Sequence, residues 1–311
     1  MDYRQLGRTD LNVSTITFGC WAMGGHMWGE VDDTNSIAAV RRALELGINF
    51  YDTADIYGFG HSEEVLAEAL GSRRDEVLIA TKGTVRHEEP RGFWNDSSRA
   101  WLLQACDDSL RRLKTDRIDL YQLHWPDADT PIEESMGALR ELIDAGKIRY
   151  AGVSNYNVQQ MTECLKHLDI VSLQPPYSLV QRQVEQEILP FCLEHHLGVL
   201  AYSPMYRGLL TGKFTAEATF GEDDLRAHDG NFQGEQLRKN LARVEKLKAM
   251  AAEYGKTVAQ LALAWVLSHP AMTVALCGAK KPSQIEESAG AAGWTLTPDE
   301  RARVEELWAS V

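Results

Sequence analysis

Short apolar runs alternate with longer amphipathic segments along most of the chain. The short runs are rich in β-branched and aromatic residues, which predicts strands, whereas the longer segments have a helical period. Eight strands are predicted, at 15–18, 49–52, 77–81, 120–124, 149–153, 170–174, 198–202 and 272–276. Eight helices are predicted between or after them, at 34–46, 62–70, 97–113, 131–145, 158–167, 184–196, 257–268 and 283–289. Strict alternation of strand and helix predicts a parallel sheet covered by helices.

The number of repeats favours a closed sheet. No strand is followed by a G-x-G-x-x-G turn, so we expect a (β/α)8 TIM barrel and not an open doubly wound sheet. Residues 3–13 predict an N-terminal hairpin that could plug one end of the barrel. Residues 205–234 form a long seventh βα connection before an extra helix at 235–254, and residues 297–311 predict a C-terminal helix. Without a linker or low-complexity segment, residues 1–311 are predicted to form one domain.

Composition is that of an ordinary globular protein with a sizeable core, since 44% of residues are hydrophobic and 25% are charged. The net charge of -13 argues against nucleic acid as a partner, although a local basic pocket for phosphate is compatible with it. The five cysteines have no metal-finger spacing and are expected to be reduced and mostly buried. We find no signal-peptide pattern or long apolar stretch, so we expect a soluble cytoplasmic protein without a membrane partner.

Four ionisable residues follow three predicted strands. Asp52 ends the second strand and Tyr57 follows five residues later, Lys82 follows the third strand, and His124 ends the fourth. Taken singly, each has an ordinary explanation as a turn aspartate, a packed tyrosine, an exposed lysine or a core histidine. In a barrel, however, the C-terminal ends of all strands meet on one face. We therefore expect these four side chains to converge there.

The four residue types suit the reduction of a carbonyl group. A tyrosine can donate a proton to the developing alkoxide if a nearby ammonium lowers its pKa toward the working pH. Lys82 could supply that ammonium, Asp52 could keep the lysine charged, and His124 could orient the substrate oxygen.

Several segments resemble the signature sequences of the aldo-keto reductases, in the order found in that family. These segments are Asp52-Thr53-Ala54-Asp55-Ile56-Tyr57-Gly58, Ala80-Thr81-Lys82-Gly83, Asp119-Leu120-Tyr121-Gln122-Leu123-His124-Trp125-Pro126 and Gly152-Val153-Ser154-Asn155-Tyr156. The chain is most similar to bacterial family-11 members and to the potassium-channel β-subunits, because of Tyr202-Ser203-Pro204 and Gly278-Ala279-Lys280-Lys281-Pro282-Ser283-Gln284. The resemblance implies a catalytic tetrad with Tyr57 as the proton donor.

A nicotinamide cofactor is implied by the same resemblance, because no side chain can supply a hydride. Ser154, Asn155 and Gln174 would bind its carboxamide, although Ser154 and Asn155 also suit a turn or helix start. Tyr202 would stack on the nicotinamide ring, and residues 203–213 would wrap the pyrophosphate. The expected cofactor-binding residues are Cys20, Trp21, Asp52, Ser154, Asn155, Gln174, Tyr202, Ser203, Pro204, Gly208, Leu209, Lys213, Gly278, Lys280, Gln284 and Ser288.

Two lysines favour NADPH over NADH. Lys280 and Lys281 precede a helix that begins near Pro282, so ammonium groups and the helix N-terminus could together hold a 2′-phosphate. Two solvated lysines are the alternative. The chain departs here from the aldose-reductase pattern, which has an arginine at the position of Gln284 and a lysine at that of Gly278.

The expected substrate is a small aldehyde or ketone, in a pocket that includes Trp21, Tyr57, Trp94, His124 and Trp125. The main alternative is a dinucleotide-sensing binding protein with slow or vestigial reductase activity. A metal-dependent barrel enzyme is a weaker alternative, because His195-His196, Asp32-Asp33 and Asp223-Asp224 lack metal-ligand spacing. No sequence feature identifies an oligomeric partner.

Overall fold

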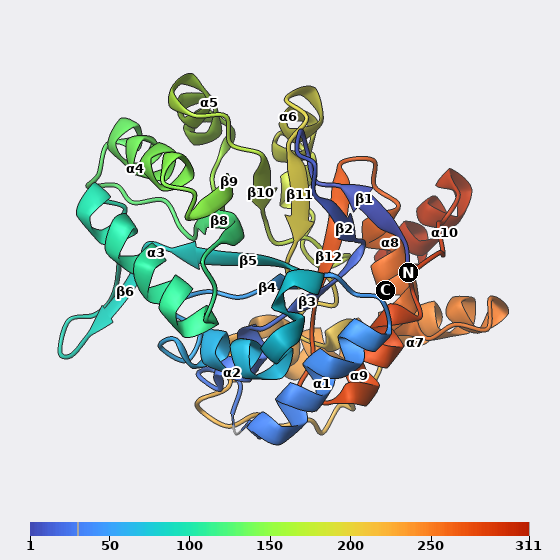
Figure 1. Cartoon of the computed structure of the whole chain (residues 1–311). Coiled ribbons are helices and arrows are strands. Elements are labelled where there is room, and N and C mark those ends of the chain that lie inside the picture. Colours follow the sequence, from blue (N-terminus) through green and yellow to red (C-terminus); the bar gives the residue numbers. More distant parts are fainter. Residues whose placement is uncertain (30, 311) are drawn as a thin grey trace.

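Eight parallel strands form a closed barrel in the computed structural model, which describes residues 1–29 and 31–310. Each strand pairs with the next barrel strand in chain order, and the last pairs with the first (Figure 1). The strands are β3 Ile16–Gly19, β4 Phe50–Asp52, β5 Leu78–Gly83, β8 Ile118–Leu123, β9 Ile148–Ser154, β10 Ser172–Gln174, β11 Gly198–Ala201 and β12 Met272–Gly278. The predicted (β/α)8 fold is confirmed, and each observed strand overlaps the predicted one.

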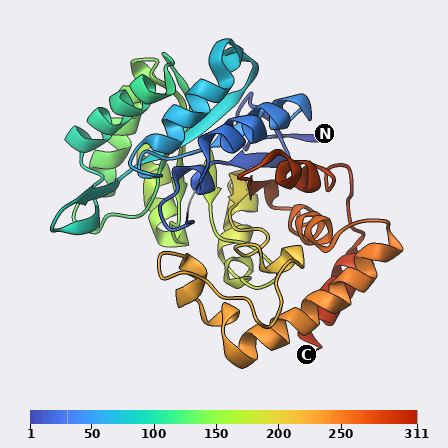
Figure 2. The same ribbon diagram turned by 90° about the horizontal axis from the view of Figure 1, so that it is seen from below.

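Helices lie outside the strands in both views of the molecule (Figures 1 and 2). They cover the barrel because one face of each is apolar and packs on the strands. All residues of helix α8 except Gln260 are buried, since the helix lies between β12 and the extra helix α7. The helices are α1 Asp33–Glu45, α2 His61–Leu70, α3 Arg99–Leu113, α4 Ile132–Asp144, α5 Val158–His167, α6 Ile188–Glu194, α7 Gly234–Glu253, α8 Val258–Leu267, α9 Pro282–Ala289 and α10 Pro298–Ala309.

The helix predicted at 184–196 is two shorter elements, the 3-10 helix η3 Gln183–Glu185 and α6. Pro190 explains the break, because proline has no backbone N–H and clashes with the preceding turn inside a helix. Pro190 lies in the first turn of α6, where proline is tolerated, but it would lie in the middle of a helix that started at residue 184. The tail helix α10 ends at Ala309, and Val311, the last residue of the predicted tail helix, lies outside the described residues.

The predicted N-terminal hairpin consists of β1 Tyr3–Gln5 and β2 Asn12–Ser14. Leu6 and Leu11 from its turn are buried against barrel residues such as Phe50. Gly7 has a φ of +52°, and a Cβ atom there would lie 2.5 Å from the carbonyl oxygen of Val171, just before β10. The hairpin therefore closes the N-terminal end of the barrel, which confirms the predicted plug.

A second hairpin, which the sequence analysis missed, follows β5 and projects from the body of the molecule (Figure 1). Its strands are β6 Val85–Glu88 and β7 Gly92–Asn95. The alternation of its side chains is only four residues long in each strand, which makes it a weak signal in the sequence.

The seventh βα connection is an ordered segment with its own small core, built from Leu209, Phe232 and Leu237 with aromatic residues around them. It contains the 3-10 helices η4 Leu209–Thr211, η5 Leu225–His228 and η6 Gly230–Phe232. Two further 3-10 helices, η1 Trp21–Gly24 and η2 Gly71–Glu76, lie in other connections.

All five cysteines are buried and free, as expected. In the described part of the chain, no helix has both the length and the apolar character that a membrane crossing requires.

Candidate active site

Lys82 is the centre of the predicted tetrad and is fully buried. Its Nζ atom donates to Oδ1 of Asp52 at 2.6 Å, to the carbonyl oxygen of Thr53 at 2.8 Å and to the hydroxyl oxygen of Tyr57 at 3.3 Å. An ammonium has three N–H donors, so these three contacts use all of them. The position of the lysine charge is therefore determined by its partners on β4 and the loop that follows.

The loop after β4 brings Tyr57 back over the barrel. The backbone N–H of Tyr57 donates to the carbonyl oxygen of Ala54 at 3.2 Å, which closes a turn. Gly58 has a φ of +60°, and its backbone lies so close to Gly24 in the first connection that a side chain would clash. The tight turn and this close approach direct the Tyr57 hydroxyl to Lys82, as the sequence analysis expected.

His124 follows β8 and faces Tyr57 edge-on, with ring centroids 5.6 Å apart. Its buried Nδ1 atom has no hydrogen-bond partner among the described residues, so it is not a core histidine with both nitrogens satisfied. Burial and the charge of Lys82 hold the pKa of His124 well below its usual value. The imidazole is therefore neutral at physiological pH and can act as a hydrogen-bond donor.

Burial and charge have opposite effects on Tyr57. Burial raises its pKa and Lys82 lowers it, and the net pKa is raised to about 12. Lys82 thus acts on this pKa in the expected direction, but burial has the larger effect. For Lys82, burial lowers the pKa, but the interactions with Asp52 and Tyr57 together outweigh it and the net direction is upward. Tyr57 consequently remains protonated and Lys82 remains charged near neutral pH.

Amide side chains connect the tetrad to the neighbouring strands. The Gln174 Nε2 atom donates to Oδ2 of Asp52 at 2.8 Å, and Ser154 Oγ donates to the Gln174 carbonyl oxygen at 2.9 Å. Asn155, with a φ of 63°, donates from Nδ2 to the backbone carbonyl of His124 at 3.1 Å. Since an ionised carboxylate only accepts hydrogen bonds, Asp52 determines which end of the Gln174 amide faces it.

A cavity of about 1710 Å³ lies over the C-terminal ends of the barrel strands. Trp21 stacks on Tyr57 inside it, with ring centroids 6.0 Å apart. Most of the predicted site residues line this cavity, namely Trp21, Asp52, Tyr57, His124, Trp125, Ser154, Asn155, Gln174, Tyr202, Ser203, Pro204, Gly208, Lys213, Gly278, Lys280, Gln284 and Ser288. Residues that are more than 200 positions apart in the chain thus meet at one site.

Four predicted residues do not line the cavity. Lys82 is fully buried and is connected to the cavity through its contacts with Asp52 and Tyr57, which do line it. Cys20 packs in the main core and Leu209 in the small core of the seventh connection, so neither side chain is available to a ligand. Trp94 packs on the guanidinium groups of Arg86 and Arg91, at 5.0 and 4.0 Å. Phe93 lines the cavity instead, because successive strand residues point to opposite faces.

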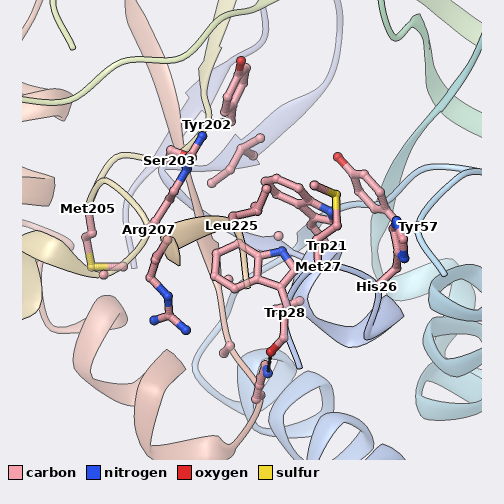
Figure 3. A pocket seen from close by; sticks show the side chains of 18 of the residues that line it. Trp21, His26, Met27, Trp28, Tyr57, Tyr202, Ser203, Met205, Arg207 and Leu225 are labelled. Carbon is pink, nitrogen blue, oxygen red and sulfur yellow. Dashed lines mark hydrogen bonds between the residues drawn. The ribbon is translucent and has the colours of Figure 1, made fainter. Parts of the chain in front are cut away.

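Several lining residues of the seventh connection were not predicted, among them Leu225 and Arg226, whereas Arg207 lies within the loop 203–213 that was expected to wrap the pyrophosphate. Figure 3 shows Tyr57 and His26 on one side of the pocket and Tyr202, Ser203 and Arg207 on the other, with Trp21, Met27, Trp28 and Leu225 between them. The backbone N–H of Leu225 donates to the carbonyl oxygen of Met27 at 3.4 Å. The first and seventh connections therefore touch across the cavity. No sequence period marks either segment.

Positive charges gather at the end of the cavity beside α9. Lys213, Arg226, Lys280 and Lys281 all line it. Burial lowers the pKa of Lys213, and the charges of Arg226, Lys280 and Lys281 lower it further. Burial and Arg226 also lower the pKa of Lys280, whose Nζ donates to the carbonyl oxygen of Trp28 at 2.5 Å. Arg226 is ion-paired with Asp224, which lines the same cavity. The three lysines beside the helix N-terminus still favour an anionic ligand.

The model of the Aldo/keto reductase family matches residues 15–309. The chain belongs to that family. Among curated relatives, aldo-keto reductase YhdN of Bacillus subtilis is 42% identical, covering 97% of this chain and 92% of the relative. A probable voltage-gated potassium channel subunit beta of Arabidopsis thaliana is 36% identical over 93% and 90% of the two chains. The NADH-specific methylglyoxal reductase of Escherichia coli is 33% identical over 97% of each.

Solved aldo/keto reductase structures agree with this assignment. Glycerol dehydrogenase AKR11B4 from Gluconobacter oxydans has a TM-score of 0.93 and 40% identity, covering 99% of this chain and 95% of that one. An aldo/keto reductase from Klebsiella pneumoniae in complex with NADP and acetate has a TM-score of 0.78 and 31% identity, with coverage of 99% and 95%. The predicted resemblance to the family and to its bacterial family-11 members is confirmed.

Proposed function

We propose that this protein is an NADPH-dependent oxidoreductase that reduces aldehydes or ketones to alcohols, with Tyr57 as the proton donor. The observation that carries the proposal is the buried Lys82, whose ammonium contacts both Asp52 and Tyr57 in the cavity wall. A metal-dependent reaction has less support, since the described residues contain no group of His, Cys, Asp and Glu side chains that could hold a metal ion.

Tyr57 would donate its phenolic proton to the carbonyl oxygen as that oxygen becomes an alkoxide. Its raised pKa keeps the proton in place until the substrate oxygen gains negative charge. Lys82 would then stabilise the phenolate through the existing contact, and Asp52 would hold the lysine in position. The neutral His124 ring would donate a hydrogen bond that orients the carbonyl.

The cavity fits a nicotinamide dinucleotide, which supplies the hydride when bound. Ser154, Asn155 and Gln174 would bind the carboxamide, and Tyr202 would lie against the nicotinamide ring. Asp52 accepts from the Nε2 atom of Gln174, so the Gln174 Oε1 atom would accept a hydrogen bond from the carboxamide.

The cluster of four cations supports NADPH over NADH, because a 2′-phosphate would relieve their mutual repulsion at the start of α9. The Klebsiella pneumoniae structure with NADP supports the same preference. The NADH-specific relative from Escherichia coli makes a direct comparison of the two cofactors necessary.

The decisive experiment follows absorbance at 340 nm with NADPH or NADH and a series of aldehydes and ketones. We expect turnover with NADPH, and a loss of about 10²–10⁴-fold in kcat for Tyr57→Phe, the usual range for a general acid. Fluorescence titration should show unchanged NADPH binding to this variant. Tyr254→Phe is the control and should retain full activity, because Tyr254 is exposed and does not line the cavity. Full activity of Tyr57→Phe would contradict the assigned role.

A dinucleotide-sensing protein is the second candidate, favoured by the similarity to a probable potassium channel subunit beta. Single-turnover and steady-state rates separate the two functions. A sensor would oxidise bound NADPH once and release the product dinucleotide slowly, whereas a reductase would sustain many turnovers with its preferred aldehyde.

A further inference from the structure

Exposed apolar side chains are concentrated around the mouth of the cavity. Four of the seven exposed large hydrophobic residues in the described part of the chain lie there: Met27, Phe59, Phe93 and Trp125 are 39%, 54%, 51% and 43% exposed. They come from four different βα connections. Contiguous exposed apolar groups are uncommon on a monomer and mark binding surfaces.

The rings around this mouth contact one another. Phe93 from β7 lies 5.7 Å from His26 and 4.5 Å from His87, measured between ring centroids. Phe59 lies 5.4 Å from His26 and 4.9 Å from His87. We call these four residues the mouth cluster. It joins the first, second and third connections into one aromatic wall.

The mouth cluster is continuous with the site of proton transfer. His26, Met27, Phe93 and Trp125 line the same cavity as Tyr57 and His124. Figure 3 shows His26 and Met27 beside Tyr57 at the side of the pocket away from Arg207. A molecule whose carbonyl lies between Tyr57 and His124 can therefore extend outward along this wall, away from the cations that would hold the dinucleotide.

We propose that the mouth cluster is a subsite for an apolar, preferably aromatic, substituent of the carbonyl substrate, with Phe93 as its main specificity residue. The inference rests on the proposed reductase function. The cluster has ring faces on three connections but no carboxylate or guanidinium among its members, which suits a neutral aryl or alkyl group. Phe93 lines the cavity and is 51% exposed, whereas Trp94 on the opposite face of the strand packs on Arg91.

The test compares propanal, hexanal and 4-phenylbutanal, whose carbonyl groups are electronically alike. In the wild-type protein, kcat/KM should rise along this series. Phe93→Ala should lower kcat/KM for 4-phenylbutanal by roughly tenfold, a change worth about 1.4 kcal/mol, mostly through KM. It should leave kcat/KM for propanal unchanged, and Phe93→Tyr should restore the wild-type values.

Trp94→Leu is the matched control, since it alters the same hairpin on the face away from the cavity. Thermal melting should verify that each variant is folded. Equal kcat/KM for the three aldehydes in the wild type, or an equal loss for all three in Phe93→Ala, would overturn the subsite. Absence of NADPH oxidation with every aldehyde would instead refute the reductase function on which it rests.

Discussion

Burial and a neighbouring charge together determine the pKa of single residues in the tetrad, and their effects can oppose each other. Tyr57 is close enough to Lys82 for a hydrogen bond, yet its pKa rises because burial penalises the phenolate more than the ammonium stabilises it. His124 has its pKa lowered by burial and by the same ammonium. Both residues therefore carry the neutral form that proton donation and hydrogen bonding to a carbonyl require.

The pH dependence of the two reaction directions should differ. In the proposed mechanism reduction requires protonated Tyr57, and the pKa of about 12 predicts a flat kcat/KM between about pH 6 and pH 10. Neutral His124 should add no acid limb in this range. Alcohol oxidation requires the phenolate, so its kcat/KM should rise about tenfold per pH unit over the same range. Initial rates in both directions check this, and a decline of the reduction rate near pH 8 would contradict it.

At the scale of elements, the tetrad residues lie at one end of the barrel and the N-terminal hairpin closes the other end. Asp52 ends β4, Lys82 lies near the end of β5, and His124 follows β8, so the strand ends hold three tetrad members. The hairpin of β1 and β2 closes the opposite end. Stability and catalysis should therefore be separable by substitution, as in other barrels.

Leu11→Ala tests this separation. Leu11 is 2% exposed and packs inside the barrel end, so its truncation should reduce the free energy of unfolding by about 2–5 kcal/mol. Its distance from the cavity predicts an unchanged kcat under conditions where the variant is folded. The exposed Leu193, truncated in the same way, should change stability by less than about 0.5 kcal/mol. Urea unfolding measures both, and a similar loss for the two variants would refute the plug.

The whole molecule is acidic, yet four cations gather at one end of its cavity. Its net charge is -13, and Lys213, Arg226, Lys280 and Lys281 line one cavity. The general charge of the protein would repel a dinucleotide phosphate at a distance, so binding must depend on this local cluster. The cluster forms only because the seventh connection folds against the start of α9.

Lys281→Gln should therefore weaken NADPH binding by about tenfold, the size expected for one charged hydrogen bond. NADH binding should be nearly unaffected, since that cofactor lacks the 2′-phosphate. Added salt should weaken NADPH binding more in the wild type than in the variant. Lys239→Gln on α7, where the lysine is paired with Glu235, is the control. An equal loss of affinity for NADPH and NADH in Lys281→Gln, measured by fluorescence titration, would show that the lysine does not bind the 2′-phosphate.

The barrel and the place of the tetrad could be predicted from the chain alone. Alternating apolar runs and helical periods are local signals, and a parallel barrel requires every strand to end on the same face. Asp52, Lys82 and His124 could therefore be assigned to one rim without knowledge of their distances. The break of the sixth helix was missed because the effect of Pro190 depends on where the helix begins.

Contacts between distant segments decided the rest. The short hairpin of β6 and β7 turns Phe93 to the cavity and Trp94 away from it, a choice set by how the hairpin docks. The seventh connection brings Arg226 to the same cavity without any periodic signal in its sequence. The sign of the Tyr57 pKa shift also depends on packing, because the chain order reveals that a lysine is near but not how much water is excluded around both groups.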